Sequence, residues 1–306
     1  MMRNKILLRL ILILLPSIVL CQQIEKDTIK VFYLGGQSNM TGYGYNKELP
    51  KASKAAYKNI LIYQGNPVAD EKENGGLGVW EVLKPGHGKG FTSNGTKNSL
   101  SKRFGIELSF AKKLQELYPN EKIALIKYAR AGSSLDTLAA DKYGSWDVDY
   151  KGVNGINQYD NFLKTIKYAL NTADIDNDGI EDVLIPSGIV WMQGESDAAY
   201  TEEIASDYYD NLKRLMNLMR ASLHTDDLPV VIGKISDSWN DKDGIVWEHG
   251  DLVQYAQEKY VKTATNAAIV RSTRYYNYSD KWHYDTKGYL DLGEQFAEAI
   301  YLLNKK

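Results

Sequence analysis

Short apolar runs rich in β-branched residues alternate along the chain with longer stretches of helical periodicity. The runs short enough for strands are 30–34, 60–63, 123–128, 188–192, 230–235 and 268–271. The spacing of apolar positions predicts helices over 106–117, 159–170, 203–223, 251–264 and 286–303. Strands that alternate with helices indicate a parallel sheet covered on both faces. We therefore expect an α/β fold, a three-layer α/β/α sandwich around a central parallel sheet of about five strands.

Glycine and polar residues follow several of the predicted strands. Ser38 ends the run 33–38, in which two glycines and a glutamine follow the first strand. The segments 129–134 and 191–197 follow two later strands in the same way. In open α/β sheets, binding and catalytic sites form at the carboxyl ends of the strands. We therefore expect these three segments to meet at one site.

A base for Ser38 could come from the other end of the chain. A serine hydroxyl is a weak nucleophile until a base takes its proton. Asp280 and His283 are three residues apart, so one tight turn can carry both, with the carboxylate holding one ring nitrogen. A carboxylate beside His283 favours the charged imidazole, which predicts a raised histidine pKa. Asp285 is the competing orienter, although its place at the start of the last helix is typical of an N-cap.

The motifs occur in a familiar order. They are Gly-Gln-Ser-Asn-Met at 36–40, the turn at Gly132, Trp-Met-Gln-Gly-Glu-Ser-Asp at 191–197 and Asp-Lys-Trp-His at 280–283. Together they resemble the SGNH hydrolases, and most of all the branch with sialate O-acetylesterases and carbohydrate esterase family 6 acetylxylan esterases. Segment 104–111 resembles the Gly-Pro-Glu segment of that branch, with Ile106 where proline is usual. The resemblance spans most of the chain and implies an SGNH hydrolase, flavodoxin-like fold.

This resemblance implies a role for each matching catalytic residue. Ser38 is the nucleophile, His283 is the general base and then the acid, and Asp280 orients His283. The reaction is hydrolysis of an acetyl ester, which proceeds through a tetrahedral oxyanion. No cofactor is expected for catalysis.

The resemblance also implies the groups that hold the oxyanion. They are the backbone N–H of Ser38, the N–H of Gly132 and the side-chain amide of Gln193, where many SGNH enzymes have asparagine. Gln37 and Glu195 are expected to support the site. Glu195 could brace the His283 region or the Gln193 loop, or it could be a structural carboxylate.

The function expected from these motifs is a carbohydrate O-acetylesterase that releases acetate from a sugar or polysaccharide. An esterase or lipase for a non-sugar ester is one alternative, and a non-catalytic carbohydrate-binding protein on the same fold is another. Aromatic side chains can stack on sugar faces, although many simply pack in the interior. The candidates for substrate contact are Tyr43, Trp80, Trp146, Trp239 and Trp247.

The N-terminal segment has the pattern of a secretory signal peptide. Arg3, Lys5 and Arg9 precede the apolar run 10–20, which is short for a membrane span. We expect residues 1–21 to be a signal peptide, residues 22–306 to form a single esterase domain without a membrane span, and the protein to be secreted or periplasmic. The alternative is a lipoprotein anchored through Cys21. Cys21 is the only cysteine, so an internal disulfide or cysteine metal cluster is excluded.

The charge of the chain argues against a nucleic-acid partner. There are 37 basic and 39 acidic residues, a formal net charge of −2, without a long basic stripe. Removal of residues 1–21 takes away three basic residues, which brings the net charge to −5. This sign favours neutral or weakly cationic substrates.

An acidic segment before the fourth predicted strand resembles a calcium loop. Asp174, Asp176, Asp178 and Asp182 stand at its first, third, fifth and ninth positions, and a glycine stands at the sixth. The loop is not a regular EF-hand, because Ile185 stands where the bidentate glutamate belongs. A solvated acidic turn is the alternative to a structural Ca²⁺ site. In either case the loop precedes a strand, so it belongs at the end of the sheet opposite the catalytic residues.

Overall fold

A seven-stranded sheet forms the centre of the computed structural model, which describes residues 26–68, 72–152 and 155–306. The strands lie in the order β11-β10-β9-β1-β8-β3-β4. Their bounds are β1 Asp27–Gly36, β3 Tyr57–Gln64, β4 Glu81–Leu83, β8 Lys122–Ala129, β9 Asp182–Met192, β10 Val230–Gly233 and β11 Ala267–Val270. All neighbouring strands of this sheet pair in parallel, except β4, which is antiparallel to β3.

The expected α/β sandwich with a mostly parallel sheet is confirmed, and the sheet is wider than the five strands expected. Its strand order places β8 between β1 and β3, whereas the flavodoxin arrangement places the first strand beside the second. The chain places β3 and then β8 on one side of β1, and it crosses to the other side for β9, β10 and β11, so the strand order reverses at β1. Such a reversal is where the loops of an open α/β sheet separate and leave room for a site.

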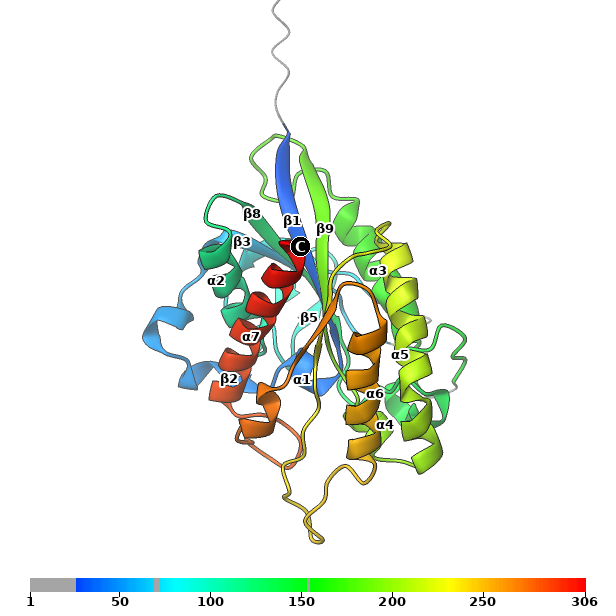
Figure 1. The fold of residues 1–306 in the computed structure, drawn as a ribbon. Coiled ribbons are helices and arrows are strands. Elements are labelled where there is room, and N and C mark those ends of the chain that lie inside the picture. The colour runs from blue at the N-terminus through cyan, green and yellow to red at the C-terminus, as the bar shows by residue number, and fades with distance from the viewer. Residues whose placement is uncertain (1–25, 69–71, 153–154) are drawn as a thin grey trace, which may run out of the picture.

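Helices cover both faces of the sheet, as Figure 1 shows. On one face, α2 (Glu107–Leu117) packs against α7 (Thr286–Asn304). On the other face lie α3 (Gln158–Leu170), α5 (Glu202–Ser222) and α6 (Gly250–Thr263). Because helices cover both sides, strand residues such as Phe32 and Leu34 are fully buried.

Several short elements lie at the carboxyl end of the sheet. Two of them directly follow strands: α1 (Ser38–Thr41) after β1, and α4 (Glu195–Ala198) after β9. The small β pairs are β2 (Gly44–Tyr45) with β7 (Arg103–Phe104), and β5 (Thr92–Ser93) with β6 (Asn98–Ser99). Single 3-10 turns cover 46–48, 51–54, 137–139, 141–143 and 272–275.

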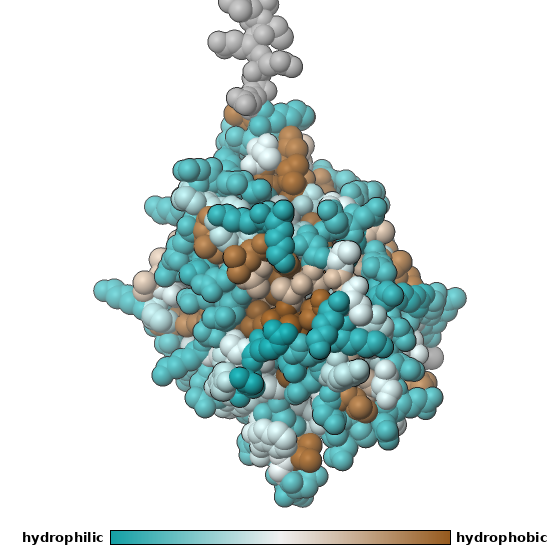
Figure 2. All heavy atoms as spheres, in the orientation of Figure 1, coloured by the Kyte–Doolittle hydropathy of each residue, from teal (hydrophilic) through white to brown (hydrophobic). Residues whose placement is uncertain are grey.

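The edge of the sheet reaches the surface at β11. Figure 2 shows an apolar area near the middle of the face between α6 and α7, where β11 lies. Ala267, Ala268 and Ile269 of this strand are half-buried. Across the described ranges, no helix combines the length and the apolar character that crossing a membrane requires. The predicted signal peptide and Cys21 lie outside the described residues.

Candidate active site

Ser38 stands at a tight turn from β1 into α1. Gly36, the last residue of β1, has a φ of +143°, and a Cβ there would lie 2.0 Å from the Met192 carbonyl oxygen. The N–H of Gln37 donates to the same carbonyl at 2.9 Å, which joins the ends of β1 and β9. Ser38 is the first residue of α1 and is buried. Its hydroxyl has no hydrogen-bond partner among the described residues.

Asp280 and His283 form the predicted pair. The Nδ1 atom of His283 lies 2.8 Å from Oδ2 of Asp280. The other carboxylate oxygen accepts the backbone N–H groups of Trp282 and His283, at 2.8 and 2.9 Å. Asp285 instead accepts the Gly288 N–H at 2.7 Å, as the N-cap of α7. The geometry therefore favours Asp280 as the orienter and leaves Nε2 of His283 as the free ring nitrogen.

Tyr43 packs flat against the imidazole of His283. The two ring centroids are 3.5 Å apart and the planes differ by 5°. The sequence suggested Tyr43 as a sugar contact, but the structure places its ring on His283. The backbone carbonyl of Tyr43 accepts a hydrogen bond from Arg103 of β7, which fixes this segment. Stacking and the Asp280 bond together hold the imidazole in one plane and one orientation.

The expectation of a raised His283 pKa is wrong. Burial lowers the pKa of His283 below its usual value of 6.5, and Asp280 opposes this effect without reversing it. The positive charges of Arg103 and Lys89 lower the pKa further. A histidine with a lowered pKa is neutral at pH 7, which is the form that a general base needs.

Asn39 connects the nucleophile turn to the His283 loop. Its amide nitrogen donates to Oε1 of Glu195 at 2.7 Å and to the Trp282 carbonyl at 3.3 Å. Its carbonyl oxygen accepts the hydroxyl of Tyr289 at 2.8 Å and the backbone N–H of Tyr284 at 3.4 Å. Asn39 thus contacts the backbone on both sides of His283 and follows Ser38 directly, so it brings two distant parts of the chain together.

Glu195 supports Asn39 from inside the protein. It is the first residue of α4, is buried, and leaves its second oxygen, Oε2, without a hydrogen-bond partner among the described residues. Burial raises the pKa of Glu195 to about 7, although the Asn39 hydrogen bond acts in the opposite direction. Of the three roles left open by the sequence, the geometry favours bracing of the His283 region.

The contacts of the Gln193 amide do not favour the oxyanion role expected for it, and that role stays a prediction. Its nitrogen Nε2 lies 2.6 Å from Oδ2 of Asp197, 3.1 Å from Oε1 of Gln37 and 3.3 Å from the Ser133 carbonyl. An amide nitrogen has two hydrogens, so protein acceptors already use both. The residue is 0% exposed, and the hydroxyl of Tyr208 donates to its Oε1 at 3.0 Å. Gln193 therefore holds neighbouring segments together.

Two of the expected oxyanion donors keep free N–H groups. Neither Ser38 nor Gly132 donates its backbone N–H to another described residue. Gly132 has a φ of +80°, and a Cβ there would lie 2.6 Å from the ring of Tyr143, so only glycine fits this turn. Their oxyanion role stays a prediction.

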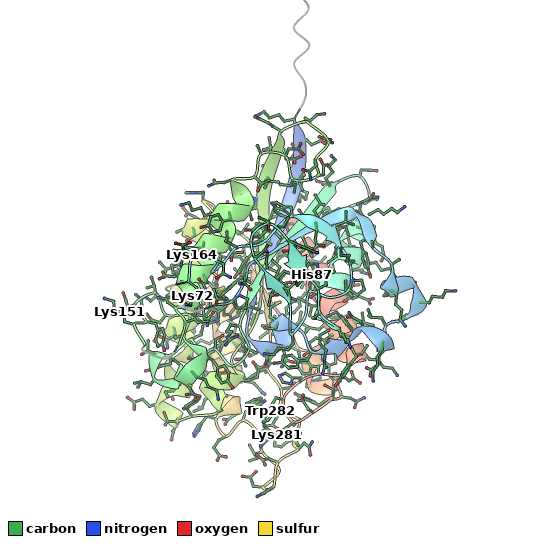
Figure 3. The ribbon with its side chains drawn as sticks, turned by 180° about the vertical axis from the view of Figure 1, so that it is seen from behind. Lys72, His87, Lys151, Lys164, Lys281 and Trp282 are labelled. Carbon is green, nitrogen blue, oxygen red and sulfur yellow. The ribbon has the colours of Figure 1, made fainter. Side chains whose placement is uncertain are left out.

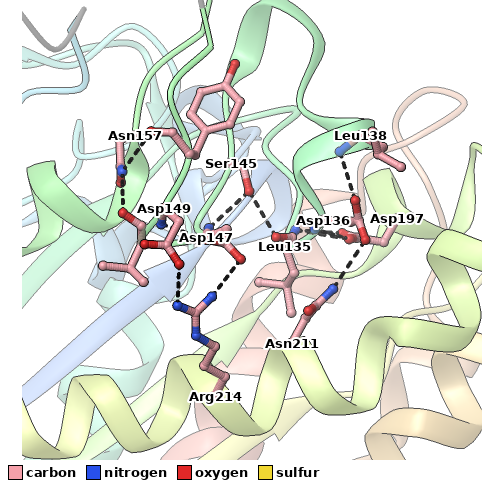
Figure 4. A network of polar contacts seen from close by, with 12 residues as sticks. Leu135, Asp136, Leu138, Ser145, Asp147, Asp149, Asn157, Asp197, Asn211 and Arg214 are labelled. Carbon is pink, nitrogen blue, oxygen red and sulfur yellow. Dashed lines mark hydrogen bonds and ion pairs between the residues drawn. The ribbon is translucent and has the colours of Figure 1, made fainter.

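Asp197 is a site residue that the sequence did not reveal. Its carboxylate accepts the backbone N–H groups of Leu135 at 3.0 Å and Asp136 at 2.8 Å, as Figure 4 shows, in addition to the Gln193 amide. Burial raises the pKa of Asp197 to about 6. This carboxylate ties the loop that follows Gly132 to the end of β9. The sign of this contact in the sequence is that Asp197 lies four residues after Gln193.

A buried ion pair supports the other end of α1. The Lys127 ammonium lies 2.7 Å from Oε2 of Glu107, and both side chains are fully buried. It also donates to the carbonyls of Thr41 at 3.0 Å and His87 at 2.9 Å. Thr41 is the last residue of α1, so this charge fixes the helix that carries Ser38. Glu107 belongs to segment 104–111, which the sequence related to the family without giving it a role.

Beside the site lies a cavity of about 530 Å³. Its walls include Thr41 of α1 and Ala131, the neighbour of Gly132. Of the described residues that line it, Lys89, Lys97 and Arg130 are cationic and none is acidic. The negative net charge suggested neutral or weakly cationic substrates, but the charged residues that the structure describes around this cavity are all cationic.

The tryptophans suggested as sugar contacts differ in exposure. Trp80 and Trp146 are buried and Trp247 is half-buried, so these three pack in the interior. Trp239 is 69% exposed. Trp282, which the sequence did not single out, is 47% exposed and directly precedes His283.

The acidic loop lies at the opposite end of the sheet from Ser38, as expected (Figure 1). Carboxylate oxygens of Asp174, Asp176 and Asp182 lie within 4.8 Å of one another, and Asp178 groups with Asp176 and Asp27 instead. The donor set suits Ca²⁺, but Lys122 also contacts Asp27 and lies 3.0 Å from Asp176. The Asp174 carboxylate already accepts the N–H groups at 177 and 179. Calcium binding stays a prediction.

The fold and the site define the class of protein. The parallel sheet, the serine at the turn after its central strand, and the Asp280–His283 pair before the last helix agree with what the resemblance to SGNH hydrolases implies. The family model described as carbohydrate esterase, sialic acid-specific acetylesterase matches residues 28–302. The chain therefore belongs to this family, and it is a hydrolase that acts on acetyl esters of carbohydrates.

Solved structures share the fold at low sequence identity. A protein from Arabidopsis thaliana has a TM-score of 0.60 at 20% identity, with 89% of this chain and 97% of that chain covered. NanS has a TM-score of 0.58 at 18% identity, with 92% and 99% covered. A carbohydrate acetylesterase from Xanthomonas citri has a TM-score of 0.59 at 15% identity, with 91% and 57% covered. Comparison with curated protein sequences gives no match.

Proposed function

We propose that this protein removes O-acetyl groups from an acidic sugar, with Ser38, His283 and Asp280 as its catalytic residues. The geometry of the pair supports this assignment, because Asp280 binds Nδ1 of His283 and leaves Nε2 to act as the base. A sugar acid with an acetylated hydroxyl fits both the chemistry of this site and the cationic cavity beside it.

The reaction follows from these residues. His283 takes the Ser38 proton as the serine oxygen attacks the acetyl carbonyl, which forms a tetrahedral oxyanion. The sugar oxygen leaves with the proton from His283, and the acetyl group stays on Ser38. Water, deprotonated by His283, then attacks the acetyl-serine, and acetate leaves as Ser38 regains its proton. Asp280 stabilises the imidazolium in both halves of the reaction.

The N–H groups of Ser38 and Gly132 are the donors that we assign to the oxyanion. Each preorganised donor of this kind contributes about 2.7–4 kcal/mol to the transition state. Gln37 supports this arrangement, because its Oε1 accepts the N–H groups of Gly194 at 3.3 Å and Ser196 at 3.2 Å. These bonds connect the nucleophile turn to the end of β9.

The charge of the cavity is the observation that supports an acidic sugar as the substrate. Lys89, Lys97 and Arg130 line it, and Nε of Arg130 is buried without a partner among the described residues. A guanidinium group matches a carboxylate in a bidentate geometry, so the carboxylate of a sugar acid would satisfy Arg130. A neutral polymer such as acetylated xylan has no group for this role.

Acetate release from matched substrates tests the proposal. O-acetylated sialic acid should be hydrolysed with a lower KM than acetylated xylan, and Ser38→Ala should abolish release from both while the protein stays folded. Arg130→Gln should raise the KM for the acidic substrate and leave turnover of 4-nitrophenyl acetate unchanged. Equal KM values for the acidic substrate in the wild type and Arg130→Gln would contradict the proposed preference for an acidic sugar. Binding without acetate release would favour the non-catalytic alternative.

We also propose that residues 1–21 direct export of the protein. The basic start and apolar run of this segment support the assignment. Determination of the N-terminal residue of the secreted protein tests it. A chain that begins at Gln22 fits signal-peptide removal, whereas a lipid-modified Cys21 fits the lipoprotein alternative.

A further inference from the structure

Exposed tryptophan is confined to one end of the molecule. All six tryptophans lie in the described ranges, and four of them are buried or half-buried. The two exposed ones are Trp239, at 69%, and Trp282, at 47%. Figure 1 shows the loop around Trp239 projecting at the pointed end of the molecule, and Figure 3 shows Trp282 and Lys281 near this end.

Two contacts hold these tryptophans on neighbouring segments. The Ser238 hydroxyl donates to the Lys281 carbonyl at 2.8 Å, and the Lys281 ammonium forms an ion pair with Asp241. The residues on both sides of Trp239 are thus tied to the residue before Trp282. The Trp282 carbonyl in turn accepts a hydrogen bond from Asn39, the neighbour of Ser38. This chain of contacts connects the exposed indoles to the catalytic residues.

Trp239 is held in a conformation that its residue type does not favour. Its φ is +57°, in the left-handed region, which is uncommon for a bulky residue. Oδ1 of Asp237 accepts the Trp239 N–H at 2.7 Å. Oδ2 accepts the N–H groups of Val246 at 2.9 Å and Trp247 at 2.8 Å, at the far side of the loop. One carboxylate therefore closes the loop and keeps a large apolar ring in water.

We propose that Trp239 and Trp282 form a stacking subsite for sugar residues next to the acetylated one, so that the natural substrate is an oligosaccharide or polysaccharide. The broad indole face suits the apolar C–H face of a pyranose ring, and tryptophan gives a large contact area with little loss of conformational freedom. The inference rests on the proposed function, because the acetylated residue of the same glycan must lie at Ser38. The subsite begins one residue from His283, where the rest of a glycan chain would leave the site.

The experiment compares three acetyl esters: an acetylated oligosaccharide, its acetylated monosaccharide and 4-nitrophenyl acetate. Trp239→Ala and Trp282→Ala should each raise the KM for the oligosaccharide roughly three- to tenfold. In Trp239→Ala, kinetics on the monosaccharide and the small ester should stay as in the wild type. Tyr255→Ala is the matched control, because Tyr255 is 70% exposed on α6, outside both segments, and should change none of the three.

A second variant separates binding from folding. Trp239→Gly suits the left-handed backbone, so it should not lower Tm, while it should still raise the KM for the oligosaccharide. Unchanged oligosaccharide KM in both alanine variants overturns the subsite. If Trp282→Ala loses turnover on 4-nitrophenyl acetate, the role of Trp282 in the subsite is overturned as well. Such a loss would show that Trp282 positions His283. Failure of the wild type on every acetyl ester would instead overturn the proposed function.

Discussion

Asn39, the residue after the candidate nucleophile, forms a buried hydrogen bond of 2.7 Å with Glu195. Asn39 also holds the backbone on both sides of His283, through Trp282 and Tyr284. The position of the base relative to Ser38 therefore depends on a carboxylate that is buried inside the protein. Two predictions follow from the burial and the charge of Glu195.

The first prediction concerns positioning. Glu195→Ala removes the acceptor of the Asn39 amide, so the His283 loop should loosen and kcat on 4-nitrophenyl acetate should fall about 10- to 100-fold. Glu195→Gln keeps an acceptor oxygen and should retain most of the activity. If Glu195→Ala is as active as the wild type, Asn39 holds the loop without help from Glu195.

The second prediction concerns stability and pH. Because burial raises the pKa of Glu195 to about 7, the folded protein holds this proton at pH values where the unfolded chain has lost it. Its contribution to stability is therefore greatest below the ordinary carboxyl pKa and is lost as pH rises through about 7. Glu195→Gln has no proton to lose, so its Tm minus that of the wild type should grow between pH 5 and pH 8. Asp197 is present in both proteins, so its effect on Tm cancels in this difference. A constant difference would show that Glu195 is ionised throughout.

The third prediction concerns the acidic limb of activity. His283 must be neutral to accept the Ser38 proton, and burial lowers its pKa, so turnover should fall only below about pH 6.5. Lys89→Gln removes a positive charge that lowers this pKa and should move the limb to higher pH, measured on 4-nitrophenyl acetate.

Asp280→Asn should cut turnover by about 10⁴-fold, because the imidazole loses its orienter. Asp285→Asn should leave turnover unchanged and lower Tm, and the reverse result would exchange the roles of the two aspartates.

Local pattern was sufficient to predict the fold class and the pairing of Asp280 with His283. Buried parallel strands are short continuous apolar runs, and Asp280 and His283 share one turn, so neither prediction needed long-range contacts. The edge strand β4 has only three residues and gave no such run. It therefore escaped prediction.

The supporting contacts depend on segments that are far apart in the sequence. Asn39 meets Glu195 and Tyr284 only after the sheet has assembled, and nothing in the pattern near residue 43 indicates a ring stacked on His283. The contacts of Gln193 could not be predicted because the direction of its amide depends on Asp197, which accepts one of its hydrogens. The positive cavity combines side chains from loops around residues 89, 97 and 130, so the net charge of the chain could not reveal it.

The fourth prediction tests the acidic loop. Calcium should raise Tm through Asp174, Asp176 and Asp182, because a ligand that binds only the folded state stabilises it. Lys122 competes as a bound cation, so Lys122→Gln should increase the calcium-dependent shift. Turnover should not change, because the loop lies at the opposite end of the sheet. Equal Tm values in calcium and in chelator, for both proteins, would exclude the site and leave a solvated acidic turn.

The fifth prediction separates the two roles considered for Gln193. If its amide held the oxyanion, Gln193→Ala would lower kcat by two to three orders of magnitude with little change in stability. The structure instead uses its hydrogens on Asp197 and Gln37, and each of these buried acceptors would lose one of its donors. Gln193→Ala should therefore lose about 1–3 kcal/mol of unfolding free energy, and the folded fraction should keep more activity than loss of an oxyanion donor would allow. Gln193→Glu is the sharper variant, because it preserves the shape and puts a second carboxylate against Asp197. Denaturant unfolding and kcat measured on the same preparations distinguish the two roles: a large loss of kcat at unchanged stability in Gln193→Ala would restore the amide to the oxyanion hole.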